Sequence, residues 1–378
     1  MEQVKKLICK SSAKSCESDP ISTRIVKEQL AGFLPMITDI VNRSLQEGSF
    51  PNTSKNALVR PLLKKVNLEL IHKNYRPVSN LEYLSKIIER AACEQIITYV
   101  ETTSTMEPLQ SAYRRSHSTE TALLKIKSDI LSMIDKGEIV CMALLDLSAA
   151  FDTVSHKLLL NRLKYRFGFD GKILAWLQSY LLNRSQQVVI GDTNTTGAMS
   201  DKINLTQGVP QGSILGPILY NLYTSPIGSV CRSHGVNFHS YADDQQDYIS
   251  FNPKVNMAKD QCLSKLENCI MDIWSWMKTN LLKLNDEKTE FIIFGTNYKL
   301  RQLGEIELRV GDDIIRARNS VRNLGFHMDQ LLKNTTHVNK LFFSVHHHQE
   351  NWSDPEKYIE FNGKNAHASI GSFTFGLL

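Results

Sequence analysis

Three aspartates in two short segments are the residues of this sequence best suited to joint chemistry. Asp243 and Asp244 lie at the centre of a segment, Val236 to Phe251, whose flanks carry the aromatic and β-branched residues typical of a β-hairpin. Asp146 ends the apolar run that starts at Ile139, which predicts a buried strand. An isolated Asp-Asp pair is more often an exposed turn. The third carboxylate favours a shared site, because a carboxylate at the end of a buried strand needs a partner or a cation.

Carboxylates on two adjacent strands can hold Mg²⁺, a hard cation that prefers oxygen ligands and keeps positions open for phosphate oxygens. Two such ions about 4 Å apart can stabilise an attacking 3′-oxygen and a leaving pyrophosphate. We therefore predict two Mg²⁺ ions as cofactors, with Mn²⁺ as the alternative ion. This is the chemistry of a nucleic-acid polymerase.

Three motifs in a fixed order indicate a family. Tyr241 to Asp244 spells Tyr-Ala-Asp-Asp, Leu145 to Val154 contains Leu-Asp-Leu-Ser-Ala-Ala-Phe-Asp, and Gly208 to Pro217 begins with Gly-Val-Pro-Gln-Gly. Each motif alone could occur by chance. Together they resemble the reverse transcriptases of non-LTR retrotransposons, of the LINE or Jockey-like type. The resemblance covers Ser49 to Asp329.

The resemblance implies an RNA-directed DNA polymerase of the α+β class, shaped as a right hand whose thumb is largely missing. Fingers are expected over Pro51 to Lys136, followed by an antiparallel palm sheet with covering helices. Asp146 and Asp243 would bridge both metal ions, with Asp244 nearby and the backbone carbonyl of Leu147 on the nucleotide-side ion. The implied partners are an RNA template, a DNA primer and deoxynucleoside triphosphates.

The resemblance also implies residues that bind the incoming nucleotide. Arg76 and Arg114 would meet phosphate oxygens, since a guanidinium binds them in a bidentate manner. Phe151 would lie under the sugar and reject a ribose 2′-hydroxyl, which disfavours RNA synthesis. Gln211 would lie beside the nucleotide and the template, and Gly212 would allow close backbone approach. The alternatives are a surface position for Arg76 and a core position for Phe151.

Lys288 is the candidate general acid toward the leaving pyrophosphate, with an ordinary lysine at the end of a loop or helix as the alternative.

Two positions depart from the family pattern. Ala112-Tyr113 replaces Gly-Phe, which suggests a displaced loop. Asp247 replaces an apolar residue on the returning strand, where its side chain either faces the core at a cost of a few kcal/mol or points to solvent.

The chain divides into three predicted regions. Residues 1–48 are expected to form a helical linker, residues 49–329 the reverse transcriptase, and residues 330–378 a degenerate, poorly ordered tail. We expect no endonuclease domain before Asp19, so that nicking would be supplied only in trans. His346-His347-His348 in the tail are adjacent, which disfavours a metal site.

Composition sets weaker bounds. The formal net charge is +5, which is compatible with nucleic-acid binding but does not prove it. The seven cysteines include no Cys-x-x-Cys pair, and no apolar run predicts a signal peptide or a membrane span. These features predict an intracellular protein without distinguishing nucleus from cytoplasm. The rival function is a catalytically weak or inactive retrotransposon remnant that at most binds nucleic acid.

Overall fold

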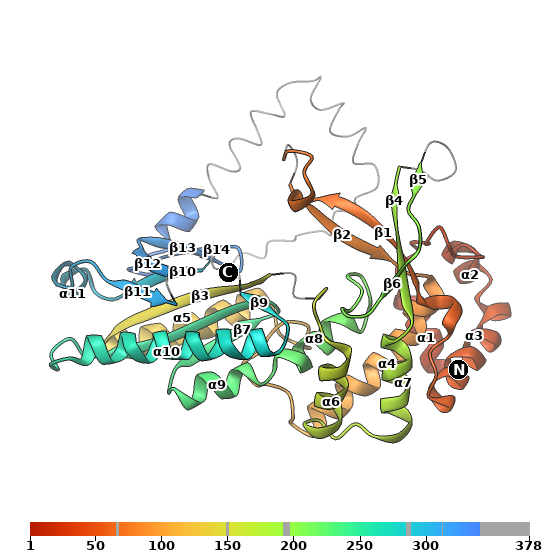
Figure 1. The fold of residues 1–378 in the computed structure, drawn as a ribbon, viewed down its shortest axis with the longest axis horizontal. Coiled ribbons are helices and arrows are strands. Elements are labelled where there is room, and N and C mark those ends of the chain that lie inside the picture. Colours follow the sequence, from red (N-terminus) through yellow and green to blue (C-terminus); the bar gives the residue numbers. More distant parts are fainter. Residues whose placement is uncertain (66–67, 149–150, 192–196, 285–288, 312, 341–378) are drawn as a thin grey trace, which may run out of the picture.

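Two larger β-sheets, a separate two-stranded hairpin and the surrounding helices form the described part of the protein, here a computed structural model (Figure 1). The structure describes residues 1–65, 68–148, 151–191, 197–284, 289–311 and 313–340. The larger sheet has seven strands in the order β11-β12-β10-β3-β8-β7, with β9 paired to β3. Its strands are β3 Ile139–Ser148, β7 Asn237–Tyr241, β8 Asp244–Phe251, β9 Lys283–Leu284, β10 Glu290–Phe294, β11 Glu307–Val310 and β12 Asp313–Arg318.

Strand β3 lies in the middle of the larger sheet and is buried on both faces, as its continuous apolar run predicts. Its even-numbered residues, Val140 and Met142 among them, pack with α5, which spans Thr119–Asp135. Its odd-numbered residues pack on the opposite face, which α9 (Ile227–Ser233) and α10 (Ala258–Thr279) cover. Two apolar cores therefore sandwich the sheet.

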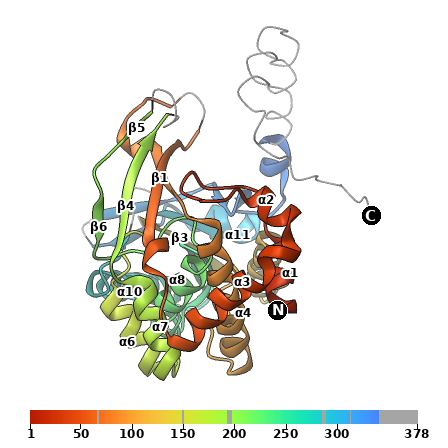
Figure 2. The ribbon, with the colours of Figure 1, turned by 90° about the vertical axis from the view of Figure 1, so that its right-hand side faces the viewer.

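The smaller sheet stands apart from the larger one, beside the N-terminal helices (Figures 1 and 2). Its strand order is β2-β1-β4-β5, with β6 also paired to β4. Strand β1 pairs with β2 in antiparallel and with β4 in parallel orientation. Its strands are β1 Asn56–Leu63, β2 Tyr75–Asn80, β4 Arg184–Ile190, β5 Ala198–Met199 and β6 Ile203–Leu205.

The remaining elements surround these sheets. The first 48 residues contain three helices, the last of which ends at Gly48 in the left-handed conformation. A hairpin, β13 Ser320–Asn323 with β14 Phe326–Asp329, lies above the larger sheet. The other helices are α1 Glu2–Lys10, α2 Thr23–Glu28, α3 Leu30–Glu47, α4 Tyr83–Thr102, α6 His156–Tyr165, α7 Gly171–Leu181, α8 Gly216–Thr224 and α11 Asn297–Gln302, with 3-10 turns at Asn52–Lys55 and His72–Asn74.

The mixed helix and strand content confirms the α+β prediction in its coarse form, with one correction of detail. The larger sheet is antiparallel except for β10 and β12, which pair in parallel because α11 and β11 intervene between them. Within the described residues no helix is long and apolar enough to cross a membrane.

Candidate active site

Asp146 and Asp244 lie directly opposite each other on β3 and β8. Directly opposed residues of an antiparallel pair project from the same face, with Cβ atoms about 5 Å apart. Both side chains are partly exposed at the end of an otherwise buried strand pair. Like charges directly opposite each other are destabilising. The pair is therefore an acidic position that a cation would stabilise.

Asp243 belongs to a two-residue turn between β7 and β8. Tyr241 and Asp244 pair across the hairpin, so Ala242 and Asp243 form its tip, whereas Asp244, expected at the tip with Asp243, begins β8. Ala242 has a φ of +57°. Such a conformation suits a tight hairpin turn but strains a residue with a Cβ by roughly 1–3 kcal/mol. Residues with a strained backbone of this kind are found preferentially at functional sites.

The Tyr220 hydroxyl on α8 lies within electrostatic range of all three carboxylates. It is buried and has no hydrogen-bond partner among the described residues. Burial raises the pKa of Tyr220 well above its ordinary value, and the charges of Asp243, Asp146 and Asp244 raise it further. The Tyr220 ring packs against Phe151 with centroids 5.0 Å apart. A polar atom is therefore buried within electrostatic range of all three aspartates.

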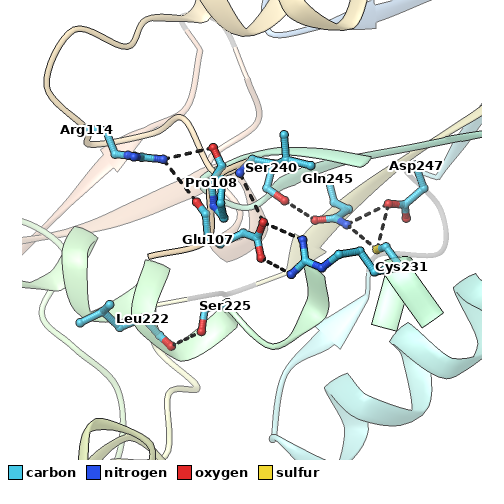
Figure 3. Close-up of polar contacts among 11 residues, drawn as sticks. Glu107, Pro108, Arg114, Leu222, Ser225, Cys231, Ser240, Gln245 and Asp247 are labelled. Carbon is cyan, nitrogen blue, oxygen red and sulfur yellow. Dashed lines mark hydrogen bonds and ion pairs between the residues drawn. The ribbon is translucent and has the colours of Figure 1, made fainter. Parts of the chain in front are cut away.

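Asp247 lies on the opposite face of β8, in a buried polar network (Figure 3). Gln245 Nε2 donates to Asp247 Oδ1 at 2.8 Å, and Ser240 Oγ donates to Gln245 Oε1 at 2.5 Å. The Cys231 thiol lies 3.5 Å from Asp247 Oδ1. Burial raises the pKa of Asp247 to about 7. Of the two predicted alternatives, the structure thus shows the core-facing one, with hydrogen-bond partners.

The glycine-rich loop between β6 and α8 lies close to two other backbones. Gln211 Nε2 donates to Asp152 Oδ2 at 3.0 Å, and the Gln211 carbonyl accepts from the Ser79 N–H at 2.7 Å. Gly212 has a φ of +121°, and a Cβ there would lie 2.4 Å from the Ser79 carbonyl oxygen. Only glycine fits this position. The loop predicted to meet the nucleotide is thus fixed against β2.

Glu89 on α4 is a positioning residue that sequence reasoning missed. Its buried Oε2 accepts from the backbone N–H groups of Ile214 at 2.8 Å and Leu215 at 3.2 Å, just before α8 begins. Burial raises the pKa of Glu89. One signal was available in the sequence. Glu89 falls on the helix face that carries Ala92 and Ile96, where an acidic residue is unusual.

The predicted phosphate-binding arginines differ in their surroundings. Arg76 is exposed on β2. Arg114 donates from Nη1 to the backbone carbonyls of Glu107 and Pro108, at 3.3 and 3.2 Å (Figure 3). These contacts hold the loop that precedes α5. That helix begins with a reciprocal capping box formed by Ser118 and Thr121.

The remaining predicted positions are placed as follows. Leu147 lies near the end of β3, where its backbone pairs with that of Leu284. Ala112 avoids the left-handed conformation, which Tyr113 adopts instead with a φ of +60°. Lys288 and the tail from residue 341, with its three histidines, lie outside the described residues.

Asp146 and Asp244 also line a pocket that reaches the tip of the β13–β14 hairpin. The hairpin contributes Arg322, Asn323 and Leu324, and β12 contributes Arg318. The pocket thus joins three acidic groups, Asp146, Asp244 and Glu290, to two arginines, of which Arg318 is ion-paired with Glu290. An arrangement of this kind can accept a nucleic-acid phosphate beside bound cations.

The donor atoms at this site suit a hard divalent cation, but they do not close on one point. Within the described part of the chain, no group of three or more acidic, histidine or cysteine side chains is gathered as a metal site. The carboxylate oxygens are the ligand chemistry that Mg²⁺ prefers. The residues therefore fit such a cation by donor type.

A family model described as reverse transcriptase (RNA-dependent DNA polymerase) matches residues 63–328. The chain belongs to this family. The match includes both carboxylate strands and the glycine-rich loop between them. The predicted recognition is therefore confirmed at the level of the family.

Several curated relatives come from mobile elements of Drosophila. The RNA-directed DNA polymerase from mobile element jockey of Drosophila melanogaster is 26% identical over 90% of this chain and 36% of its own length. The probable RNA-directed DNA polymerases from transposon BS and transposon X-element, of the same species, are 28% and 30% identical. They match 66% and 58% of this chain, and 27% and 23% of their own lengths. The chain thus spans about a quarter to a third of these relatives, whose names support the non-LTR type.

Proposed function

We propose that this chain catalyses RNA-templated addition of deoxynucleotides to a primer 3′-end. The observation that carries the proposal is the register of β3 and β8, which sets Asp146 opposite Asp244 beside the turn that bears Asp243. Membership of the reverse transcriptase family supports it. We infer that the larger sheet is the palm and the smaller sheet belongs to the fingers. Together they would form the right hand within residues 49–329.

Asp146, Asp243, Asp244 and the Leu147 carbonyl would hold the divalent cations of the reaction, two Mg²⁺ with Mn²⁺ as the alternative. When bound, such cations supply charge stabilisation to the attacking 3′-oxygen and to the leaving pyrophosphate. The two opposed carboxylates on β3 and β8 support this assignment.

The residues around the carboxylates would select and orient the nucleotide. The Phe151 ring, held against Tyr220, would block a ribose 2′-hydroxyl by its bulk. Gln211 would contact the nucleotide from a loop fixed to β2, with Gly212 allowing close backbone approach. Exposed Arg76 would meet phosphate oxygens. Lys288 stays a prediction as general acid.

Arg114 fits the predicted triphosphate role only in part. Its Nη1 atom is used by backbone carbonyls, so the other guanidinium nitrogens would meet phosphate. We propose an RNA template and a DNA primer as partners, with any nicking supplied in trans. We also propose an intracellular location, in the nucleus or the cytoplasm.

Extension of an oligo-dT primer on poly-rA with Mg²⁺ and dTTP tests the function. Asp243→Asn should lower the rate about a thousandfold or more, because the change removes a charge worth several kcal/mol in the transition state. Asp260→Asn, on exposed α10 surface, is the control and should leave the rate unchanged. A folded natural chain that binds primer–template without extending it would contradict the proposal and support the remnant.

A further inference from the structure

The turn that carries Asp243 has two backbone groups that its own hairpin leaves without ladder bonds. Ala242 and Asp243 form the tip, so the N–H and C=O of Ala242 lie beyond the last paired residues, Tyr241 and Asp244. Ala242 is also held at a φ of +57° although it is not glycine. A strained turn persists only where its surroundings determine its conformation. Something outside the hairpin must therefore hold this turn.

The Gln110 side chain contacts both groups. Its Oε1 accepts from the Ala242 N–H at 3.0 Å, and its Nε2 donates to the Ala242 carbonyl at 3.4 Å. The same Oε1 accepts from the Ala112 N–H at 3.0 Å. A carboxamide carries both the acceptor for the N–H and the donor for the C=O of a single residue such as Ala242. Gln110 is only 5% exposed, so water does not compete freely for these bonds.

Gln110 is itself fixed by its neighbours. Its segment runs parallel to β7, with the Ser240 N–H bonded to the Leu109 carbonyl at 2.9 Å and the Ser111 N–H bonded to the Ser240 carbonyl at 3.0 Å. Arg114 Nη1 donates to the Gln110 carbonyl at 3.2 Å. The Gln110 amide therefore approaches the turn from a rigid base.

The same contacts reach the nucleotide loop. Asn221 Nδ2 on α8 donates to the Ala112 carbonyl at 2.8 Å, and α8 directly follows the glycine-rich loop. Gln110, Asn221, Ser240 and Ala242 also line one small cavity behind the turn. The turn therefore rests in a polar socket built from the segment before α5 and from α8.

We propose that Gln110 is the positioning residue that holds the Ala242–Asp243 turn in the conformation that presents Asp243 to cation and primer. The inference rests on the proposed polymerase function. Gln110 acts through the turn and does not touch the reacting atoms. Its loss should leave the chain folded and substrate bound while Asp243 moves away from its working position.

Two substitutions and one control separate this role from general stability. Gln110→Met keeps the length and burial of the side chain but removes both hydrogen-bonding atoms. Gln110→Glu keeps an acceptor for the two N–H groups and loses the donor. Gln261→Met makes the same exchange at an exposed position on α10. In every measurement below, we expect Gln261→Met to behave like the natural chain, Gln110→Glu to show a smaller change and Gln110→Met to show the largest change.

Hydrogen exchange measured by mass spectrometry tests the turn without any substrate. The peptide that covers residues 237–244 should exchange about fivefold faster at the turn in Gln110→Met, because one hydrogen bond is worth roughly 1 kcal/mol. Peptides from α10 should exchange as before. Unchanged exchange at the turn would overturn the proposal.

Steady-state primer extension and Mn²⁺ calorimetry test the consequence. In Gln110→Met, kcat should fall about 10- to 100-fold, because a displacement near 1 Å at a reacting centre costs that much. The KM for dTTP should stay within about twofold, since Gln110 does not bind substrate. Mn²⁺ should bind several-fold more weakly. A changed KM with an unchanged kcat would overturn the proposal.

Two further outcomes have a defined interpretation. If Gln110→Met does not fold, Gln110→Glu carries the test, and natural exchange, kcat and Mn²⁺ binding in that variant would overturn the proposal. If the natural chain extends no primer, the polymerase function fails. Exchange and Mn²⁺ binding would then still show whether Gln110 holds the turn.

Discussion

The Ser79 backbone N–H donates to the Gln211 carbonyl at 2.7 Å and so ties β2 to the loop proposed to meet the nucleotide. The bond joins residues that lie far apart in the sequence. It brings the two backbones so close that the next residue, Gly212, has no room for a side chain. The first prediction follows from this contact.

Gly212→Ala should displace the loop. Its Cβ would meet the Ser79 carbonyl oxygen at 2.4 Å, and its φ of +121° is unsuited to alanine. We expect the free energy of unfolding to fall by about 3 kcal/mol or more in urea titrations. Gly235→Ala is the matched control, because its φ of +67° is also left-handed but no atom lies within 4 Å of the new Cβ. It should cost only about 1 kcal/mol, and equal costs at the two sites would contradict the clash.

Glu89 should matter as a hydrogen-bond acceptor. Glu89→Leu and Glu89→Gln both remove the charge, but only the glutamine variant keeps an oxygen for the Ile214 and Leu215 N–H groups. Urea unfolding should show the leucine variant to be less stable than the glutamine variant by about 2–4 kcal/mol. Glu101→Leu, at the exposed end of the same helix, should change little. Equal stability of the two Glu89 variants would refute this role.

Asp247 should make folding stability depend on pH. Its pKa of about 7 in the folded chain exceeds the ordinary value of 3.8, so the folded state favours the protonated acid. This contribution is full below about pH 4 and is lost as pH rises through about 7. Between about pH 5 and about pH 8, the natural chain should lose on the order of 3 kcal/mol relative to Asp247→Asn. Parallel urea-unfolding curves for the two proteins across this range would contradict the assignment.

The Tyr220 hydroxyl should contribute nothing to stability in the metal-free chain. Tyr220→Phe removes a buried oxygen that has no partner among the described residues and keeps the ring packed on Phe151. We expect the free energy of unfolding to stay constant or to rise by up to about 1 kcal/mol. Tyr248→Phe is the contrast, because that hydroxyl donates to Asp129 at 2.6 Å and its loss should cost about 1–3 kcal/mol. A comparable loss in both variants would show that the Tyr220 hydroxyl is bonded after all.

Local patterns in the sequence predict the parts of this site that depend on local structure. The apolar run before Asp146 gives the buried strand, and the turn residues at Ala242 and Asp243 give the hairpin. The cap at Ser118 follows from residue types three positions apart. Each of these signals lies within a short run of neighbouring residues, where the type of side chain directly affects the backbone conformation.

Contacts between distant segments could not be predicted in this way. Gln110 and Ala242 lie 132 positions apart, and Glu89 and Leu215 lie 126 apart. The local sequence around a glutamine or glutamate does not indicate which distant residue its side chain will contact. The position of Asp247 was undecided for the same reason, since its partner Cys231 comes from another element. The order of strands in the smaller sheet likewise depends on packing and not on local preference.

The parallel pairing of β1 with β4 has a consequence for synthesis on the ribosome. Asn56 and Ser185, which sit side by side in that pairing, are separated by 129 positions. Until the chain has been synthesised through Ile190, the end of β4, β1 and β2 form a lone hairpin, which is marginally stable in water, and one edge of β1 has no neighbour. A ribosome that stalls before Arg184 would therefore release a product with an open, aggregation-prone strand edge. Synthesis of β4 is therefore the step that covers the open edge of β1 and lowers the risk of aggregation.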